Sequence, residues 1–309
     1  MPEPVRVAVA PDAAPEVVTA VRDGGGVLVD ASAADALVWT DPLDLDGLAR
    51  TLASSPARWV QLPFAGVERF VAAGVVDPAR TWTCAKGVYG PATAEHALGL
   101  TLALARRIHV HARARSWAPR TGEDRERTLD GATVVVVGTG GIGTALAGML
   151  APLRARVVGV NRSGRPLAGA ERTVTTGALP DAVADAAFVV VAAALTPATR
   201  HLVDAALLAR MDAGAGLVNV ARGGLVDTDA LVDALRAGAI AGAALDVTEP
   251  EPLPDDHPLW TLPAALVTPH VANTWPMALP ALAALVRRNV ARFARGEPLE
   301  GLVDPAAGY

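Results

Sequence analysis

The chain has 309 residues, of which 51% are hydrophobic and 19% are charged, and its formal net charge is −5. This composition is typical of one large or two medium globular domains, and it excludes a mainly disordered chain and the basic surface that a nucleic-acid partner requires. The N-terminus has no signal-peptide pattern, no apolar run approaches the roughly 18 residues of a membrane span, and the single cysteine cannot form an internal disulfide, so we expect a cytoplasmic protein without a membrane partner.

The first hundred residues alternate short apolar runs with helical patterns. Such alternation predicts βαβ units and a parallel sheet. The predicted strands are Val5–Ala10, Val27–Val29, Ala36–Trp39 and Trp59–Leu62, and the predicted helices between them are Pro15–Asp23 and Leu45–Ser54.

Apolar residues at helical spacing then predict one long helix over Pro91–Trp117. Its basic end is interpreted as a solvated face or a subunit contact, and a polar loop over Pro119–Thr128 follows it. A second α/β unit comes next. Its predicted strands are Thr133–Val137, Val157–Val160, Phe188–Ala192, Leu217–Val220, Ala243–Asp246 and Leu266–Thr268, and the last predicted helix is Leu279–Arg295.

A glycine-rich turn, Gly138-Thr139-Gly140-Gly141-Ile142-Gly143, directly follows the strand Thr133–Val137 and opens a helix predicted over Thr144–Leu150. In this G-x-G-x-x-G pattern the first glycine permits a tight turn, the second lets a pyrophosphate approach the backbone, and the third lets helix and strand pack closely. The helix N-terminus offers N–H groups to the phosphates. The turn therefore predicts a dinucleotide site.

The residues after the next strand, Asn161, Arg162 and Ser163, bear on which dinucleotide binds. NAD-dependent enzymes usually place Asp or Glu here to bind the ribose 2′-hydroxyl, and this segment has neither. Arginine is suited to bidentate phosphate binding, so the pattern favours the 2′-phosphate of NADP(H). In the alternative, Arg162 stacks on the adenine and the chain binds NAD(H).

Three polar motifs follow later strand ends: Asn219-Val220-Ala221-Arg222-Gly223-Gly224, Asp246-Val247-Thr248-Glu249-Pro250-Glu251-Pro252 and Thr268-Pro269-His270. Ligands of open α/β sheets bind outside the carboxyl ends of the strands, so these motifs are expected at the same edge as the glycine turn. Arg222 and Glu251 are 29 positions apart, and Glu251 and His270 are 19 apart.

In order and spacing these motifs, with Thr196–Leu202 before them, resemble the D-isomer-specific 2-hydroxyacid dehydrogenase family, which includes phosphoglycerate dehydrogenase, glyoxylate/hydroxypyruvate reductase and D-lactate dehydrogenase. The resemblance covers nearly the whole chain and implies an NAD(P)-dependent oxidoreductase. It implies an α/β fold of two doubly wound parallel-sheet domains. A Rossmann cofactor domain, residues 95–275, is inserted into a flavodoxin-like substrate domain of residues 1–94 and 276–309. The family is commonly dimeric, so we expect a homodimer.

The resemblance also implies the site residues. His270 is expected to be the general acid–base, with Glu251 on its far ring nitrogen and Arg222 on the carboxylate and carbonyl of a small 2-keto or 2-hydroxy acid. The loop residues Phe64, Ala65 and Gly66 are expected to contact substrate. The expected cofactor residues are Gly138, Gly140, Gly141, Ile142, Gly143, Asn161, Arg162, Ser163, Thr199, Ala221 and Asp246; no metal site is expected.

Several alternatives concern substrate and function. Relatives that oxidise phosphite carry Lys where Ala65 stands, and relatives that oxidise formate carry Gln where Glu251 stands, so neither activity is expected. The loop has no cation for a phosphorylated substrate. Cys84, Lys86, Tyr89 and Trp275 either contact substrate or serve packing. A dinucleotide-sensing corepressor is the alternative to an enzyme, although such proteins usually carry long disordered tails.

Overall fold

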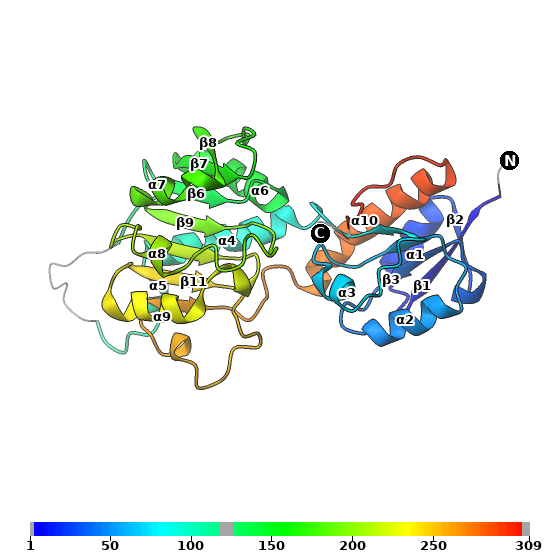
Figure 1. The fold of residues 1–309 in the computed structure, drawn as a ribbon, viewed down its shortest axis with the longest axis horizontal. Helices are drawn as coiled ribbons and strands as arrows, with labels where there is room; N and C mark the ends of the chain where they lie inside the picture. Colours follow the sequence, from blue (N-terminus) through cyan, green and yellow to red (C-terminus); the bar gives the residue numbers. More distant parts are fainter. Residues whose placement is uncertain (1–2, 118–125, 305–309) are drawn as a thin grey trace. The chain divides into compact units, whose positions relative to one another are not determined.

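The computed structural model describes residues 3–117 and 126–304, and the chain forms two compact units (Figure 1). Unit 1 contains the described parts of Met1–Tyr89 and Thr274–Tyr309, and unit 2 is Gly90–Asn273. Both ends of the chain therefore build unit 1, and unit 2 is inserted between them. The boundaries predicted at 94/95 and 275/276 fall inside helices α4 (Gly90–Ala105) and α10 (Trp275–Ala294).

Unit 1 is a sheet of five parallel strands in the order β2-β1-β3-β4-β5, the flavodoxin-like order. Apolar residues of α1 and α10 pack on one face, and those of α2 and α3 pack on the other. Adjacent residues of β1 point to opposite faces: Val7 to the first and Ala8 to the second. The remaining bounds are β1 Val5–Ala10, β2 Gly26–Leu28, β3 Ala36–Trp39, β4 Trp59–Gln61, β5 Thr81–Thr83, α1 Pro15–Asp23, α2 Leu45–Ala53 and α3 Glu68–Ala72.

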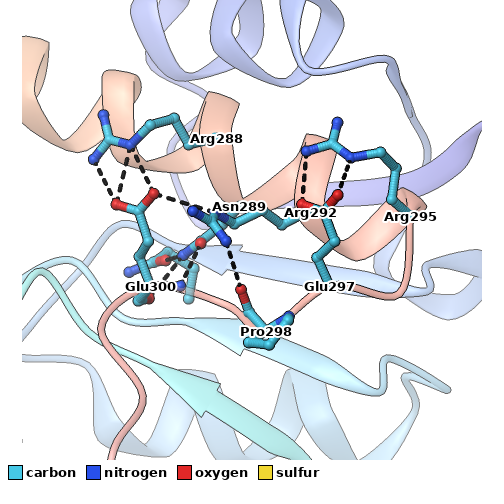
Figure 2. Close-up of polar contacts among 8 residues, drawn as sticks. Arg288, Asn289, Arg292, Arg295, Glu297, Pro298 and Glu300 are labelled. Atoms are coloured by element: carbon cyan, nitrogen blue, oxygen red, sulfur yellow. Dashed lines mark hydrogen bonds and ion pairs between the residues drawn. The ribbon is translucent and has the colours of Figure 1, made fainter.

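Polar contacts fasten the C-terminal segment to this sheet (Figure 2). The fully buried Asn289 of α10 donates from Nδ2 to Gln61 Oε1 at 3.1 Å and to Glu300 O at 3.0 Å, and it accepts from Glu300 N at 2.8 Å. The Glu300 carboxylate also pairs with Arg288 and Arg292. The side chain of Asn289 thus joins β4, α10 and the tail in one network.

Unit 2 is a sheet of seven parallel strands in the order β12-β11-β10-β9-β6-β7-β8. Six of these strands, β6 to β11, have the 3-2-1-4-5-6 order of a Rossmann fold, and β12 extends the sheet. The doubly wound fold class predicted for both units is confirmed. The bounds are β6 Thr133–Val137, β7 Arg156–Asn161, β8 Arg172–Thr175, β9 Phe188–Val191, β10 Gly216–Asn219, β11 Gly242–Leu245, β12 Ala265–Val267, α5 Ile108–His111, α6 Gly141–Leu150, α7 Leu179–Ala184, α8 Ala205–Leu208 and α9 Thr228–Ala237.

Helices cover both faces of this sheet. Val134 and Val136 of β6 pack with α4 and α6, whereas Val135 and Val137 pack with α7, α8 and α9. Because both faces are buried, β6 reads in the sequence as a continuous run of valines rather than as an alternating strand.

The single helix predicted over Pro91–Trp117 is wrong. Helix α4 ends at Ala105, and Arg107 adopts a left-handed conformation with φ +50° before the short helix α5. One left-handed residue ends the helical hydrogen-bond ladder, and an apolar pattern that continues past it gives no sign of the break. Residues 119–125 of the loop predicted over Pro119–Thr128 lie outside the described residues.

Two kinds of feature are absent from the described part of the chain. No helix in residues 3–117 and 126–304 is long and apolar enough to cross a membrane. Within the same ranges no three His, Cys, Asp or Glu side chains are grouped so as to hold a metal ion.

Candidate active site

The glycine turn lies where the strand order of unit 2 reverses, between β6 and its neighbour β9. Gly138 has φ +101°, and a Cβ added to it would lie 2.5 Å from Ala192 O beside the end of β9. A Cβ on Gly143 would lie 2.1 Å from Gly138 O, whereas a Cβ on Gly140 would meet nothing within 4 Å. Packing therefore requires two of the glycines, and the third borders open space at the start of α6, which is the cradle that a pyrophosphate needs.

Asn161, at the end of β7, uses its side chain to shape the loop that follows. Its Nδ2 donates to Thr139 Oγ1 and to Arg165 O, both at 2.8 Å, and its Oδ1 accepts from Ser163 N at 3.1 Å. These bonds tie the glycine turn to the loop 162–165. Arg162 and Arg165 are exposed on this loop, where an arginine can reach a phosphate.

His270 and Glu251, from the loops after β12 and β11, meet directly. His270 Nδ1 lies 2.6 Å from Glu251 Oε1, and the two side chains are 52% and 42% exposed. Because a carboxylate can only accept, Nδ1 carries a proton, and Nε2 is the ring nitrogen left to exchange a proton with a ligand. His270 has φ +53°, a left-handed conformation that is uncommon for a residue with a side chain.

Asp246, at the end of β11, organises the loop that carries His270. Its carboxylate accepts from Thr268 Oγ1 at 2.6 Å, Val271 N at 2.9 Å and Ala272 N at 3.0 Å, and its carbonyl oxygen accepts from His270 N at 2.8 Å. Burial by itself raises the pKa of Asp246, but the hydrogen bonds outweigh it, so the pKa lies below its usual value. The carboxylate is therefore held in its ionised form inside the loop.

Arg222, on the loop after β10, is half-buried, and its NH1 donates to Ala221 O at 2.7 Å. The two glycines that follow it allow this loop to touch the next one. A Cβ on Gly223 would lie 1.9 Å from Thr248 O, and one on Gly224 would lie 3.3 Å from Glu249 Oε1. Arg222 and Glu251 thus stand on loops in direct contact, at the ends of adjacent strands.

Glu249 forms a second charged cluster on these loops. Arg200 donates to both of its carboxylate oxygens, at 3.0 and 2.9 Å, and His201 Nε2 lies 3.1 Å from Oε2. The hydrogen bond from His201, with those from Arg200, lowers the pKa of Glu249. This cluster fastens the segment Thr196–Leu202 to the loop that carries Glu251. Sequence reasoning had not singled it out, because Arg200 and Glu249 are 49 positions apart.

Other expected cofactor residues lie on the same loops. The Thr199 hydroxyl donates to Ala194 O at 2.7 Å and so holds its own turn, Ala221 is buried, and Ile142 stands in the first turn of α6. His96, on α4, contacts both Thr268 and Asp246.

The expected substrate loop belongs to unit 1 and follows β4. Phe64 packs with Tyr89 and Trp275 at ring-centroid distances of 5.8 and 5.9 Å, and the Tyr89 hydroxyl donates to Pro63 O at 2.5 Å. Ala65 is exposed and Gly66 half-buried. Tyr89 and Trp275 thus support the loop by packing on Phe64.

The lone cysteine and lysine lie near this loop in the sequence but differ in burial. Cys84 is fully buried in the core of unit 1, and burial raises the pKa of its thiol. Lys86 is exposed. For Cys84 the packing alternative is the one that the structure bears out.

Several known proteins are similar to this chain. A family model described as "D-isomer specific 2-hydroxyacid dehydrogenase, NAD binding domain" matches residues 98–272. The chain is 40% identical over 301 residues to an uncharacterized protein in the proB 3′ region of Corynebacterium melassecola, covering 95% of this chain and 97% of that protein. It is 36% identical over 223 residues to a glyoxylate reductase from Pyrococcus furiosus, covering 69% of this chain and 66% of that protein.

A solved structure matches both units. The chain resembles the crystal structure of a D-isomer specific 2-hydroxyacid dehydrogenase from Xanthobacter autotrophicus Py2 in complex with NADPH and MES, with a TM-score of 0.85 and 31% identity. The match covers 99% of this chain and 100% of that one. The family model spans the glycine turn, Arg222, Glu251 and His270, and the structural match adds unit 1.

Proposed function

The chain belongs to the D-isomer-specific 2-hydroxyacid dehydrogenase family and is an NAD(P)-dependent oxidoreductase, and from this premise we propose that it reduces a small, non-phosphorylated 2-keto acid such as glyoxylate or hydroxypyruvate. The observation that carries the proposal is the 2.6 Å contact between His270 Nδ1 and Glu251, on the sheet edge that also holds the glycine turn. The relatives with a named activity are reductases and dehydrogenases, which favours this function over a corepressor.

We assign to His270 the transfer of a proton to the carbonyl oxygen of the substrate. When bound, the reduced nicotinamide supplies the hydride that goes to the carbonyl carbon. His270 starts as the imidazolium, gives its Nε2 proton to the carbonyl oxygen, and ends as the neutral ring with its proton on Nδ1. Glu251 accepts from Nδ1 throughout, so it stabilises the imidazolium and fixes the tautomer that remains.

Arg222 is assigned to the substrate carboxylate and the carbonyl oxygen, because its guanidinium is a planar donor suited to two acceptors at once. Asp246 Oδ2 accepts one hydrogen bond among the described residues, from Ala272 N, so it retains acceptor capacity for the nicotinamide carboxamide. Thr199, Ala221 and the glycine turn complete the proposed cofactor site. The proposal also assigns Phe64, Ala65 and Gly66 to the substrate.

For the cofactor we propose a preference for NADP(H). The side chain of Asn161 is engaged in the loop, and the exposed Arg162 is the group that would hold a 2′-phosphate. The similar enzyme from Xanthobacter autotrophicus was crystallised with NADPH. Arg162→Ala should raise the KM for NADPH about tenfold or more and leave the KM for NADH unchanged, because a charge-assisted bond is worth about 1.5–3 kcal/mol. Arg172→Ala, an exposed arginine on β8, is the control.

The decisive experiment measures reduction of glyoxylate and hydroxypyruvate with NADPH and NADH by the wild type, His270→Gln and Glu251→Gln. A positioned general acid contributes about 10²–10⁴-fold, so kcat of His270→Gln should fall by at least about 100-fold. His111→Gln, an exposed histidine paired with Glu126, is the control and should retain full activity. Failure of the wild type to reduce either keto acid, or full activity of His270→Gln, would contradict the proposal.

The homodimer and the cytoplasmic location predicted from the sequence belong to the same proposal. The chain mass is 31.5 kDa, so light scattering of the purified protein should give twice that value. A monomer mass at micromolar concentration would exclude the dimer.

A further inference from the structure

His96 contacts the catalytic loop but takes no part in the proposed chemistry. It lies on α4, is 24% exposed, and is far in sequence from the loops after β11 and β12. Its Nε2 lies 3.0 Å from Thr268 Oγ1 and 3.3 Å from Asp246 Oδ1. All three residues belong to unit 2, so this contact lies within one compact unit.

Counting protons assigns the direction of each hydrogen bond in this group. A threonine hydroxyl has one proton, and an ionised carboxylate has none to give. The 2.6 Å contact between Thr268 Oγ1 and Asp246 Oδ1 therefore uses the hydroxyl proton. Thr268 Oγ1 can then only accept from the histidine, so His96 Nε2 must carry a proton. The chain of donors runs from His96 through Thr268 to Asp246.

The same group encloses the backbone of His270. The Asp246 carboxylate binds the N–H groups of Val271 and Ala272, and the Asp246 carbonyl oxygen binds the N–H of His270. A non-glycine residue in the left-handed region costs about 1–3 kcal/mol, so surrounding contacts must hold it there. Thr268 and Ala272 stand on either side of His270, and both are bonded to Asp246.

We propose that His96 is a positioning residue of the reductase: by donating from Nε2 to Thr268, it directs the Thr268 proton to Asp246 and holds the loop 268–272 in the conformation that sets His270 against Glu251. The inference rests on the proposed function, because the loop matters to catalysis only if His270 is the proton donor. Without the His96 donor, the Thr268 hydroxyl is free to turn, and the carboxylate loses a fixed partner.

The test compares variants that keep or remove each donor. His96→Gln places an amide N–H near the position of Nε2, and His96→Leu removes it. Thr268→Ser keeps the hydroxyl, and Thr268→Val replaces it by a methyl group of similar shape. The exposed neighbour Glu95→Gln is the control on the same helix. The assays are kcat and KM for glyoxylate with NADPH, the melting temperature, and the protonation of ring nitrogens by ¹⁵N NMR of the protein alone.

We expect His96→Leu and Thr268→Val to lower kcat by about 10–100-fold with little change in the KM for glyoxylate, since a small misplacement of a reacting group costs up to about 100-fold. His96→Gln and Thr268→Ser should recover most of kcat. The double variant His96→Leu/Thr268→Val should lose no more than Thr268→Val alone, because both changes break one chain of hydrogen bonds. NMR should show a protonated Nε2 on His96.

Three results would overturn the inference: wild-type kcat in His96→Leu, losses that multiply in the double variant, or an unprotonated Nε2 on His96 near neutral pH. A purely structural role would lower the melting temperature of all four variants together and would give no recovery by His96→Gln. His270→Gln separates the two proposals. If it remains active, the proposed function fails; if it is inactive while His96→Leu is fully active, only the role of His96 fails.

Discussion

The three glycines of the G-x-G-x-x-G pattern allow a sharp test, because packing requires Gly138 and Gly143 whereas Gly140 borders open space. Gly143→Ala should destabilise unit 2. Its Cβ would lie 2.1 Å from Gly138 O, which is 0.9 Å closer than the 3.0 Å limit for real side-chain carbons. Overpacking of this kind costs about 1–3 kcal/mol, and a unit of this size loses about 2–4 °C per kcal/mol, so the melting temperature should fall by roughly 2–12 °C.

Gly140→Ser should leave the stability of the fold nearly unchanged and weaken the binding of NADPH. Gly140 has φ −78° and caps α6, a position that serine fills well, so stability should change by less than about 0.5 kcal/mol. Its side chain would, however, enter the open space beside the turn, and the Kd for NADPH should rise at least about tenfold. A substitution of Gly140 thus tests NADPH binding without a change in the stability of the fold.

Gly148→Ala is the matched control on the same helix. Gly148 is exposed, and a Cβ on it would meet nothing within 4 Å, so the change should stabilise α6 by about 0.4–1 kcal/mol. The assays are thermal unfolding by circular dichroism and titration of NADPH by fluorescence. Unchanged stability in Gly143→Ala would refute its role in packing, and unchanged NADPH affinity in Gly140→Ser would refute its role in binding.

Three further outcomes follow from contacts outside the turn. Asn289→Ala should lower the free energy of unfolding in urea by about 1–3 kcal/mol, because it removes three hydrogen bonds: one to the buried Gln61 Oε1, which keeps its bond from Thr83, and two to the part-buried Glu300 backbone; a loss below about 0.5 kcal/mol would contradict this network. The pKa of Glu249 is lowered by its bond from His201, so its stabilising effect is present above the pKa of the unfolded chain and is lost as pH falls through the lower folded value. Between about pH 5 and about pH 3, the melting temperature of Glu249→Gln should therefore fall less than that of the wild type. Equal decreases would contradict this role of the Glu249 carboxylate. Cys84 is fully buried, so the native protein should react with a thiol reagent far more slowly than the unfolded protein; equal rates would show an accessible thiol.

Most of the fold could be predicted because buried parallel strands have a strong sequence pattern. The valine run of β6 and the limits of β1 and β3 follow from this pattern. The pattern did not predict β8, whose four residues are exposed or only partly buried, nor the short strand β5 at the other sheet's edge. Strand β8 buries little surface, so it needs few apolar residues, whereas β5 buries Trp82 and Thr83 and was missed because it has only three residues, two of them threonine. The sequence pattern also did not predict that the helix ends before Arg107, because this end depends on one backbone angle.

The site was predictable where chemistry fixes the residue type and not where two side chains merely support each other. The family resemblance implies a His as general acid and a Glu as its carboxylate, so His270 and Glu251 could be paired in advance, and the structure brings them together. The contact of His96 with Thr268 spans 172 positions. Many residue types can hold a loop, so the sequence around His96 indicates a helix and gives no sign of its distant partner.

The assembly of unit 1 from both chain ends has a consequence for biosynthesis. Strands β1 to β5 are complete once about ninety residues have been made, yet their sheet face lacks α10, and Gln61 lacks Asn289, until nearly the whole chain has been translated. Unit 2 needs no later segment, so it is free to fold on the ribosome first. Until α10 is made, the strands of unit 1 expose the apolar face that α10 later covers, so they are the part of the nascent chain most exposed to aggregation.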